Sequence, residues 1–365
     1  MRRGAKAMVA LLALCTPAAE AGEFHGLLRS RDLTPFGFLR LDMRPAHAVT
    51  IEEGGWAIET EIGYQNTWAL SPEVESYLTA REPLGRRDLG PLDFTAIRAL
   101  PGENFLLDLE SAAVDVTLHY KVSSQWTAYL IGSYVTYQGG FLDSTIESFH
   151  DTFGFSSFGR LSGNRNEVNL LYDLKSTQVS AFDSPVDGGF TDPTIGLRYS
   201  GLDLPGDRWE LALEAAAKIP VAGERELLST GRTDYGIQAA LQRRAEHHAL
   251  YVNAAAVYYA GGDFPVPQDE QIVPTLIVGY EHRLTERTNL NLQGYISTSV
   301  YSRQQTDLEE LLSDKYQISV GVRHHISSFL VTFGVTENLQ NLNNTPDIGF
   351  QLGFAWVPGR VGMTR

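Results

Sequence analysis

The chain has 365 residues and a formal net charge of −15, and its lysines and arginines form no run or stripe. This acidic balance argues against nucleic-acid binding, which needs a basic surface. The length suits one large all-β domain or two ordinary domains. The only cysteine is Cys15, so the chain beyond it contains no thiol.

Residues 1–21 have the pattern of a signal peptide. Three basic residues precede a short apolar run, "AMVALLAL" (residues 7–14), and "AEA" (19–21) supplies small residues at a cleavage site. The apolar run is far shorter than the roughly 20 residues that a membrane-spanning helix needs. We therefore expect export, with cleavage before Gly22, rather than a buried N-terminal helix.

Residues 56–68 are the first segment with a clear period. Apolar and polar side chains alternate there, and an extended chain sends successive side chains to opposite faces. The segment is therefore predicted to be a strand with one apolar and one polar face. The apolar face carries Trp56, Ile58, Ile62 and Tyr64, and the polar face carries Glu59, Glu61 and Gln65.

The same alternation recurs along the chain and predicts twelve strands, most of them close to the 9–11 residues that a tilted strand needs to cross a bilayer. Strands three, four and eleven are the least regular, and residues 165–182 either extend or replace one of these three. The predicted strands are 56–68, 112–121, 125–137, 192–200, 209–219, 234–242, 250–258, 272–280, 290–300, 316–322, 329–337 and 348–356.

The connections alternate in length. Those after the even-numbered strands are short, whereas those after the odd-numbered strands are mostly longer, and two are very long (69–110 and 138–191). Short periplasmic turns and long external loops are typical of outer-membrane barrels, and tryptophans near strand ends fit aromatic girdles. We therefore expect a closed up-and-down antiparallel transmembrane β-barrel over residues 56–356, in the outer membrane of a Gram-negative bacterium.

This fold implies the partners and the position of both ends. The barrel would contact outer-membrane lipid and be inserted by the barrel-assembly machinery. With an even strand number both termini are periplasmic, and residues 357–365 form a C-terminal tail.

On each predicted strand, the polar residues of the alternating pattern are expected to face inward and line the lumen. Eight strands leave an interior that side chains fill, and 16 to 18 leave an open channel. Twelve strands are compatible with a narrow pore, a ligand cavity or a filled interior. The candidate lumen-lining residues are Glu59, Glu61, Asp115, His119, Lys121, Arg198, Glu210, Glu214, Lys218, Gln238, Asn253 and Glu281.

The second long loop contains a predicted amphipathic helix. Ser144 and Glu147 fit a capping box, apolar residues follow at spacings of three and four, and Gly154 suits the helix end. The helix either folds into the barrel mouth as a constriction or lies against the outer leaflet. Its candidate functional residues are Ser144, Glu147, Phe149 and His150.

Sequence signals for catalysis are weak. Glu147, His150 and Asp151 share one side of the predicted helix, but a single histidine beside an acid on an exposed helix is usually solvated. His282 and His324 lie at strand ends with no serine placed opposite them. The sequence has no G-x-S-x-G, no histidine cluster with metal spacing and no phosphate loop. We expect no enzyme activity, no cofactor and no metal.

The segment 22–55 precedes the first strand and is rich in arginine. It either inserts into the barrel as a small plug, with arginines paired to lumen carboxylates such as Glu59 and Glu210, or covers the periplasmic base as a leader. The arginines are Arg29, Arg31, Arg40 and Arg44.

Several stretches resemble an uncharacterised family of Gram-negative outer-membrane barrels, known only as a domain of unknown function. They are "GLLRSRDLTPFGFLRLDMRP" (26–45), "GGFLDSTIESFHDTFGF" followed by "GR" (139–160), "DPTIGLRYS", "AAAKIPVAGE" and "NLNNTPDIGFQLGFAW". The resemblance covers nearly the whole mature chain and implies fold and location, but no activity and no site residues. Outer-membrane strands commonly finish on a terminal aromatic, whereas "VPGRVGMTR" here continues past Trp356.

Three functions fit this sequence. The favoured one is a narrow pore or channel for small solutes, because the residues predicted to face inward are rich in Glu, Gln, Asn and Thr. The alternatives are a barrel that binds or passes a hydrophobic ligand or lipid, and a structural or interaction barrel with a filled lumen. The sequence sets neither the solute nor the oligomeric state.

Overall fold

The computed structural model describes residues 24–32, 39–45, 51–175, 177–180, 188–204, 209–221, 224–225, 227–262, 269–340 and 345–356. The expected signal peptide (1–21) and C-terminal tail (357–365) lie outside these residues.

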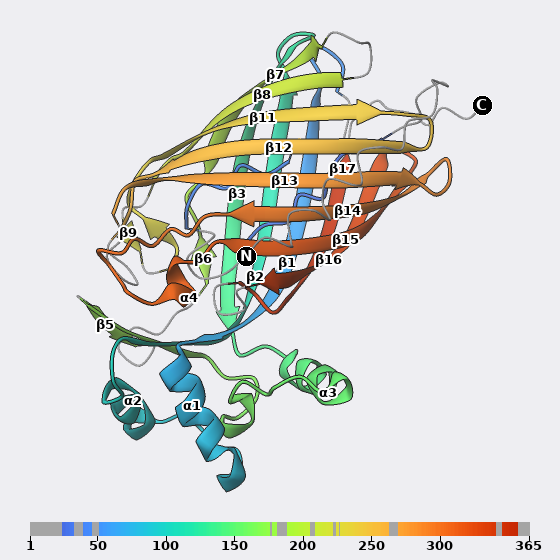
Figure 1. The fold of residues 1–365 in the computed structure, drawn as a ribbon. Helices are drawn as coiled ribbons and strands as arrows, with labels where there is room; N and C mark the ends of the chain where they lie inside the picture. Colours follow the sequence, from blue (N-terminus) through green and yellow to red (C-terminus); the bar gives the residue numbers. More distant parts are fainter. Residues whose placement is uncertain are drawn as a thin grey trace.

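Twelve antiparallel strands form a closed barrel (Figure 1). The first and last strands pair with each other, from Ile58 opposite Trp356 to Asn66 opposite Ile348, and this pairing closes the ring. The prediction of twelve strands in an up-and-down order is confirmed. The barrel strands are β1 (Trp56–Leu70), β2 (Asn104–Lys121), β3 (Trp126–Gln138), β7 (Thr194–Asp203), β8 (Trp209–Lys218), β11 (Asp234–Arg244), β12 (His248–Tyr259), β13 (Gln271–Arg283), β14 (Thr288–Ser297), β15 (Lys315–Ile326), β16 (Phe329–Gln340) and β17 (Ile348–Trp356).

The remaining elements lie in the long connections between the barrel strands. Figure 1 shows α1, α2 and α3 together beyond one end of the barrel. We identify this end as the external one, because the long connections lie there. These elements are α1 (Pro72–Arg81), η2 (Glu82–Leu84), α2 (Pro91–Arg98), α3 (Asp143–Phe153), η3 (Arg160–Ser162), β4 (Asn169–Leu174), β5 (Thr177–Ser180), β6 (Gly189–Phe190), β9 (Glu224–Arg225), β10 (Ser229–Thr230) and α4 (Glu309–Leu312). Among the described residues, no helix is long and apolar enough to cross a membrane.

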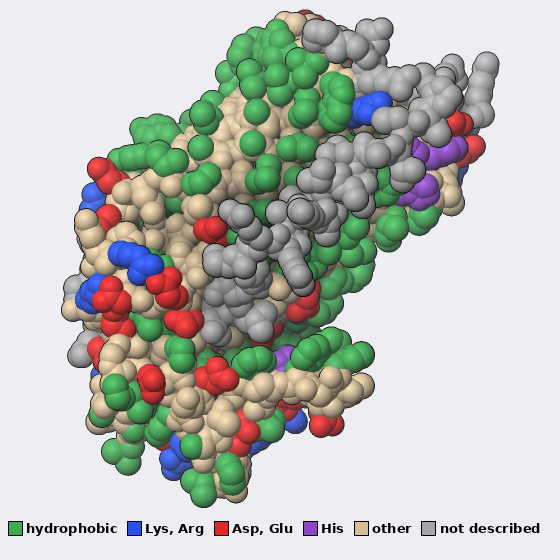
Figure 2. All heavy atoms as spheres, viewed as in Figure 1, with side chains coloured by type: hydrophobic (Ala, Val, Ile, Leu, Met, Phe, Trp, Pro, Cys, Tyr) green, Lys and Arg blue, Asp and Glu red, His purple; other side chains and the backbone are tan. Residues whose placement is uncertain are grey.

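The outer face of the barrel is apolar, and the inner face is polar. Ile237 is 65% exposed and Phe333 is 51% exposed, whereas their polar neighbours Gln238 and Thr332 are buried. This is the reverse of a water-soluble protein and matches a barrel surrounded by lipid. Hydrophobic side chains cover much of the barrel exterior in Figure 2.

Aromatic rings gather at the periplasmic rim. The rings of Trp56 and Trp356 meet edge to face at 5.4 Å, and those of Trp126 and Tyr199 do so at 4.9 Å. Indole and phenol rings favour the membrane–water interface, because one part of each ring is apolar and another part is polar. These pairs therefore mark the level at which the strands leave the bilayer.

Strands β1 and β2 continue past the external rim. Pairing of β1 with β17 stops at Asn66, and pairing of β2 with β3 begins at Glu110. Beyond this level residues 104–108 of β2 pair with β4 instead. Within the range 165–182, β4 and β5 therefore extend the sheet beyond the barrel rim and replace no barrel strand.

A small external domain is built on this extension. Helices α1 and α2 bury Val74, Leu78, Phe94 and Ile97 against one face of the extended sheet, where Leu106 of β2 contributes to the same cluster. The two helices occupy the loop 69–110, in which the sequence analysis expects only an external connection.

Helix α3 begins at Asp143 and ends at Phe153. Gly154 is left-handed, with φ of 74°, as predicted for the helix end. The predicted capping box is wrong, because the helix starts one residue earlier than Ser144 and has no side-chain cap. Glu110 of β2 instead accepts hydrogen bonds from the backbone N–H groups of Phe141 (3.1 Å) and Leu142 (2.7 Å).

Candidate functional site

The barrel lumen is the candidate functional site, and the structure places all twelve lumen-lining candidates on the inner face. Two of them, Lys121 and Glu210, are partly exposed and line a cavity at the periplasmic end. The other ten are buried: Glu59, Glu61, Asp115, His119, Arg198, Glu214, Lys218, Gln238, Asn253 and Glu281.

Residues 24–32 and 39–45, here called the luminal segment, lie among these side chains. The first part runs outward: the N–H groups of His25 and Gly26 donate to Glu281 (2.9 Å each) near the periplasmic end of β13, and Asp32 reaches Lys315 (2.6 Å) at the external start of β15. The second part returns from the external end, where Leu39 is buried in an apolar cluster. The segment therefore runs up and then down the lumen.

Ion pairs join the two parts of the luminal segment to the same wall. Arg29 lies 3.1 Å from Glu59. Arg31 from the outward part and Arg44 from the returning part share the two oxygens of Asp115, at 2.6 and 2.8 Å. Buried charges are stable when they are paired, so Asp115 fixes both parts of the segment at one point.

The expected pairing of Glu210 with an N-terminal arginine is wrong. Glu210 lies 3.2 Å from Arg244 and accepts a hydrogen bond from Gln242 (2.6 Å), both on the neighbouring strand β11. Its position at the periplasmic rim explains the difference, because a rim carboxylate finds its partners on adjacent strands.

Other candidates pair along the wall. Arg198 donates to Glu214 (2.6 Å), which also accepts from the hydroxyl of Tyr129 (2.8 Å). Nε2 of His119 lies 2.7 Å from Oε2 of Glu59. The lumen wall is thus a connected polar surface that also holds the luminal segment.

Side chains of the lumen wall donate hydrogen bonds to backbone carbonyls of the luminal segment. Arg323 donates to the carbonyls of His25, Gly26 and Leu27, with 3.0 Å to Gly26. Further bonds run from Gln293 to the carbonyl of Leu28 (3.2 Å), from Lys218 to that of Leu39 (2.6 Å) and from Gln238 to that of Arg44 (3.3 Å). A buried backbone without regular structure needs such partners.

Two wall glycines leave room for apolar side chains of the luminal segment. A Cβ atom at Gly279 would lie 2.1 Å from Leu27, and one at Gly236 would lie 2.6 Å from the sulfur of Met43 and 2.9 Å from Leu41. At Gly132 and Gly294, an added Cβ would meet nothing within 4 Å. The wall is therefore shaped to the segment at Gly236 and Gly279.

Cavities of very different size lie beside the described residues of the lumen. A cavity of about 290 Å³ opens at the periplasmic end, lined by Lys121, Arg198, Glu210 and Arg244 among others. Two cavities deeper in the lumen have volumes of about 20 Å³ each, enough for a single water molecule. Among the described residues, the buried side-chain oxygens of Gln238 and Gln293 have no protein partner, so we expect water to reach them.

An apolar cluster, here called the outer cluster, lies at the external mouth. The rings of Phe105 on β2 and Tyr172 on β4 are stacked, with centroids 6.1 Å apart and planes 9° apart. It combines residues from the extended sheet, the strand ends and the loop after β14. Its main members are Leu39, Phe105, Leu107, Leu170, Tyr172, Tyr259, Val273, Val300, Tyr301 and Leu311.

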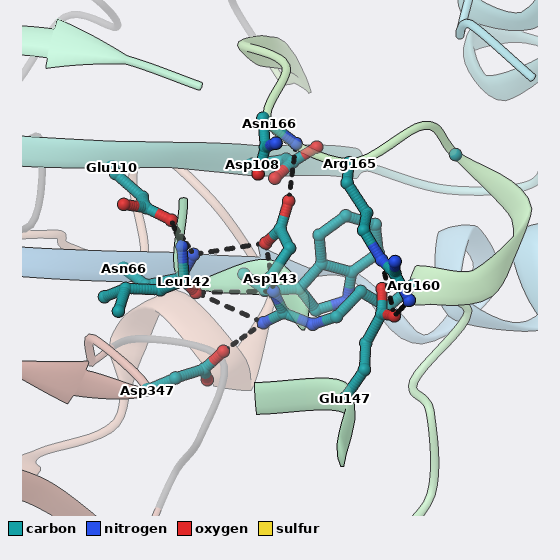
Figure 3. A network of polar contacts seen from close by, with 12 residues as sticks. Asn66, Asp108, Glu110, Leu142, Asp143, Glu147, Arg160, Arg165, Asn166 and Asp347 are labelled. Atoms are coloured by element: carbon teal, nitrogen blue, oxygen red, sulfur yellow. Dashed lines mark hydrogen bonds and ion pairs between the residues drawn. The ribbon is translucent and has the colours of Figure 1, made fainter. Parts of the chain in front are cut away.

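A polar network beside the outer cluster ties α3 to the rim (Figure 3). Arg160 donates to Asp143 of α3 (3.0 Å) and to Asp347 of the loop before β17, and its guanidinium lies 4.9 Å from the ring centroid of Trp68. Close by, Asn169 of β4 donates to Asp108 of β2 (2.9 Å). Burial raises the pKa of Asp108 to about 8.

Helix α3 lies outside the mouth, so it does not form the constriction. Phe149 is 52% exposed. Glu147 forms ion pairs with Arg86 (2.6 Å) and Arg165 (2.5 Å), and Nδ1 of His150 lies 2.9 Å from the carbonyl oxygen of Ser156. The hydroxyl of Ser148 donates to the carbonyl of Ser144 (2.7 Å). Within the described part of the chain, no three or more His, Cys, Asp or Glu side chains form a metal-binding group.

Comparison with known structures supports the barrel fold. An outer-membrane channel from Pseudomonas putida F1 aligns with a TM-score of 0.52 at 9% identity, covering 87% of this chain and 100% of that one. The NanC porin aligns with a TM-score of 0.42 at 7% identity, covering 82% and 98%. A comparison with curated protein sequences finds no match.

Residues 94–356, more than half of the chain, match a family described as proteins of unknown function (DUF3187). The closed ring of strands, the apolar exterior and the structural match place the protein in the Gram-negative outer membrane. The chain therefore belongs to the DUF3187 family, and it folds as a twelve-stranded outer-membrane β-barrel.

Proposed function

We propose that the protein is a gated channel for small polar solutes, in which the luminal segment acts as a plug. The observation that carries this proposal is that the lumen is occupied by a separate stretch of chain. Twelve strands enclose more space than wall side chains fill, and residues 24–32 and 39–45 lie in that space. Movement of the plug would open a path through the barrel.

The chemistry of the wall supports a polar solute. The inner face exposed by plug movement carries carboxylates such as Glu59 and Asp115, cations such as Lys218 and Arg323, and the amides of Gln238 and Gln293. Both signs of charge are present, so neither anions nor cations are excluded along the whole path. A small solute with hydrogen-bonding groups suits this lining better than a hydrocarbon.

A structural barrel with a permanently filled lumen is the second candidate function. The fit of Leu27 at Gly279 and the backbone bonds from Arg323 favour it, because a tightly bound segment resists displacement. The two functions differ in one measurable property, which is the current through the barrel after the plug has been weakened.

The test is single-channel recording in a planar bilayer with the variant G236V/G279V. Valine is a residue that strands favour. At position 279 its side chain would overlap Leu27, and at position 236 it would overlap Leu41 and Met43. We therefore expect the plug to be displaced from the lumen wall. Openings should be larger and longer than those of the wild type, and deletion of residues 24–50 should give the largest current. The matched control, G132V/G294V, adds the same side chains where an added Cβ meets nothing within 4 Å and should behave like the wild type.

Folding of each variant is checked separately, by the shift in gel mobility between unheated and boiled samples. If the plug variants fold and yet remain silent, including the deletion, the channel proposal is wrong and the filled barrel is correct. If the control variant also opens, the effect does not arise from the plug.

A further inference from the structure

The far end of α3 and the turn after it carry three phenylalanines in one exposed patch. Phe149, Phe153 and Phe155 are 52%, 64% and 57% exposed. Their rings lie against one another, with centroids 4.7 Å apart for Phe149–Phe153 and 5.9 Å for Phe149–Phe155. Adjacent exposed aromatic rings mark an interaction surface. These three residues are here called the aromatic patch.

The opposite side of α3 is polar. Residues three and four apart share one side of a helix, so Ile146, Phe149 and Phe153 lie on one side, and Ser144, Ser148 and Asp151 lie on the other. The polar residues are all exposed. An exposed helix with one apolar and one charged or polar side is the form that lies at a membrane surface.

Ion pairs from other loops fix the direction in which the aromatic patch points. Asp143 at the start of α3 is bound by Arg160, and Glu147 one turn later is bound by Arg86 and Arg165. All these contacts are on the side of the helix away from the patch or at its base. The patch is therefore held outward by contacts in which it takes no part.

The patch continues the lipid-facing surface of the barrel. Phe141, just before α3, is 65% exposed and stacks on Tyr64 of β1 with centroids 5.0 Å apart. Tyr64 belongs to the same outward row as Ile62, which is exposed to lipid. Figure 2 shows hydrophobic side chains along the edge of α3 that is turned toward the apolar exterior of the barrel.

We propose that the aromatic patch and Phe141 insert into the outer leaflet of the membrane and bind the acyl chains of its lipids. An amphipathic helix of this kind sits with its apolar side roughly 5–10 Å below the headgroup boundary. Because α3 is tied to Asn66 and Asp347 through Arg160, the inserted helix connects the lipid leaflet to the external rim. This inference is independent of the proposed channel activity.

The absence of cysteine after Cys15 permits a direct test by spin labelling. A nitroxide is attached to F153C and, as the matched control on the polar side, to S148C, and each protein is reconstituted in phosphatidylcholine vesicles. Collision rates with oxygen, which concentrates in lipid, and with a nickel chelate, which stays in water, then give the depth of each label. We expect the label at 153 to lie roughly 5–10 Å deep and the label at 148 to lie in water.

F149C is the second probe if F153C fails to fold, and it should report the same depth. Equal nickel accessibility at 153, 149 and 148 would overturn the proposal, because the patch would then face water. Spin–spin broadening at 153 that persists at high lipid-to-protein ratios would also overturn it, because the patch would then contact a second copy of the chain.

Discussion

The luminal segment and the outer cluster are held in the same barrel by opposite physical means. The segment is held by ion pairs and by bonds to its backbone, with water-sized cavities beside it. The outer cluster is held by stacked and interlocked apolar side chains such as Phe105 and Tyr172. The two meet at Leu39, which is the first residue of the returning part of the luminal segment and also belongs to the outer cluster.

The difference predicts different responses to conditions. Ion pairs in a hydrated lumen weaken with salt and depend on the protonation of each partner. Apolar packing is not screened by salt, and its strength depends on the shape and the area of the buried surfaces. The contacts of the luminal segment should therefore depend on salt and pH, whereas the outer cluster should hold the external domain in place under the same conditions. Three substitutions separate these properties, and they are given below in order of decreasing effect.

The largest effect is expected for Y172A in the outer cluster. The ring of Tyr172 is fully buried against Phe105, and removing such a ring costs roughly 3–5 kcal/mol. Amide hydrogen exchange along β4 should accelerate strongly, while exchange in the barrel strands β12 to β15 should not change. L84A, at a side chain that is 82% exposed, is the control and should leave β4 protected.

A smaller effect is expected for D115N in the lumen. The substitution leaves Arg31 and Arg44 without the carboxylate that they share. Breaking a buried ion pair costs roughly 3–5 kcal/mol, and water in the lumen reduces this figure here. The luminal segment should leave its site more often, so trypsin added on the periplasmic side should cleave after Arg29 and Arg40 faster than in the wild type.

The control for D115N is E309Q, which removes the exposed ion pair between Arg303 and Glu309. Such a pair contributes little to stability, so the cleavage rates should match the wild type. Unchanged cleavage in D115N would show that Asp115 does not hold the segment, and the comparison between the luminal segment and the outer cluster would fail at this point.

The smallest effect is expected for D108N, and it depends on pH. Burial raises the pKa of Asp108 to about 8 in the folded protein, whereas an exposed aspartate has a pKa near 3.9. The folded state therefore keeps the proton more tightly, and stability falls as the pH rises from about 4 to 8. D108N carries no titrating group, so this loss should disappear.

Hydrogen exchange of β4, corrected for the intrinsic effect of pH on exchange, measures this prediction. Between pH 6 and pH 8 the wild-type external domain should lose roughly 1–3 kcal/mol of local stability, and D108N should lose much less. D173N, on the same pair of strands, is the control and should follow the wild type. An identical pH dependence in wild type and D108N would assign the titration to another group.

The barrel itself could be predicted from the sequence because its signal is local. The period of two, the strand lengths and the alternation of short and long loops are properties of neighbouring residues, and each predicted strand corresponds to an observed one. The end of α3 could be predicted in the same way, from Gly154 alone. Helices α1 and α2 were missed, although Pro72 and Pro91 at their first positions and the acidic residues after them are start signals.

The contacts in the lumen could not be predicted in the same way. The alternation of residues along β2 places Asp115 on the inner face. Its shared contacts with Arg31 and Arg44 depend on the path of the luminal segment, whose sequence has no periodic pattern. The same reason explains the wrong partner of Glu210 and the wrong cap of α3. In each case a partner distant in sequence, such as Arg244 or Glu110, supplies the contact.

The position of the luminal segment relative to the junction of β1 and β17 bears on how the barrel is completed. Leu28 fits against Gly321 of β15 and Gly334 of β16, whereas the next residue, Arg29, pairs with Glu59 of β1. The full binding site for these two residues therefore exists only when the first and last strands are joined. By thermodynamic linkage, the free energy of binding the segment adds to the stability of that junction. The luminal segment thus binds across the junction at which the two ends of the strand ring meet.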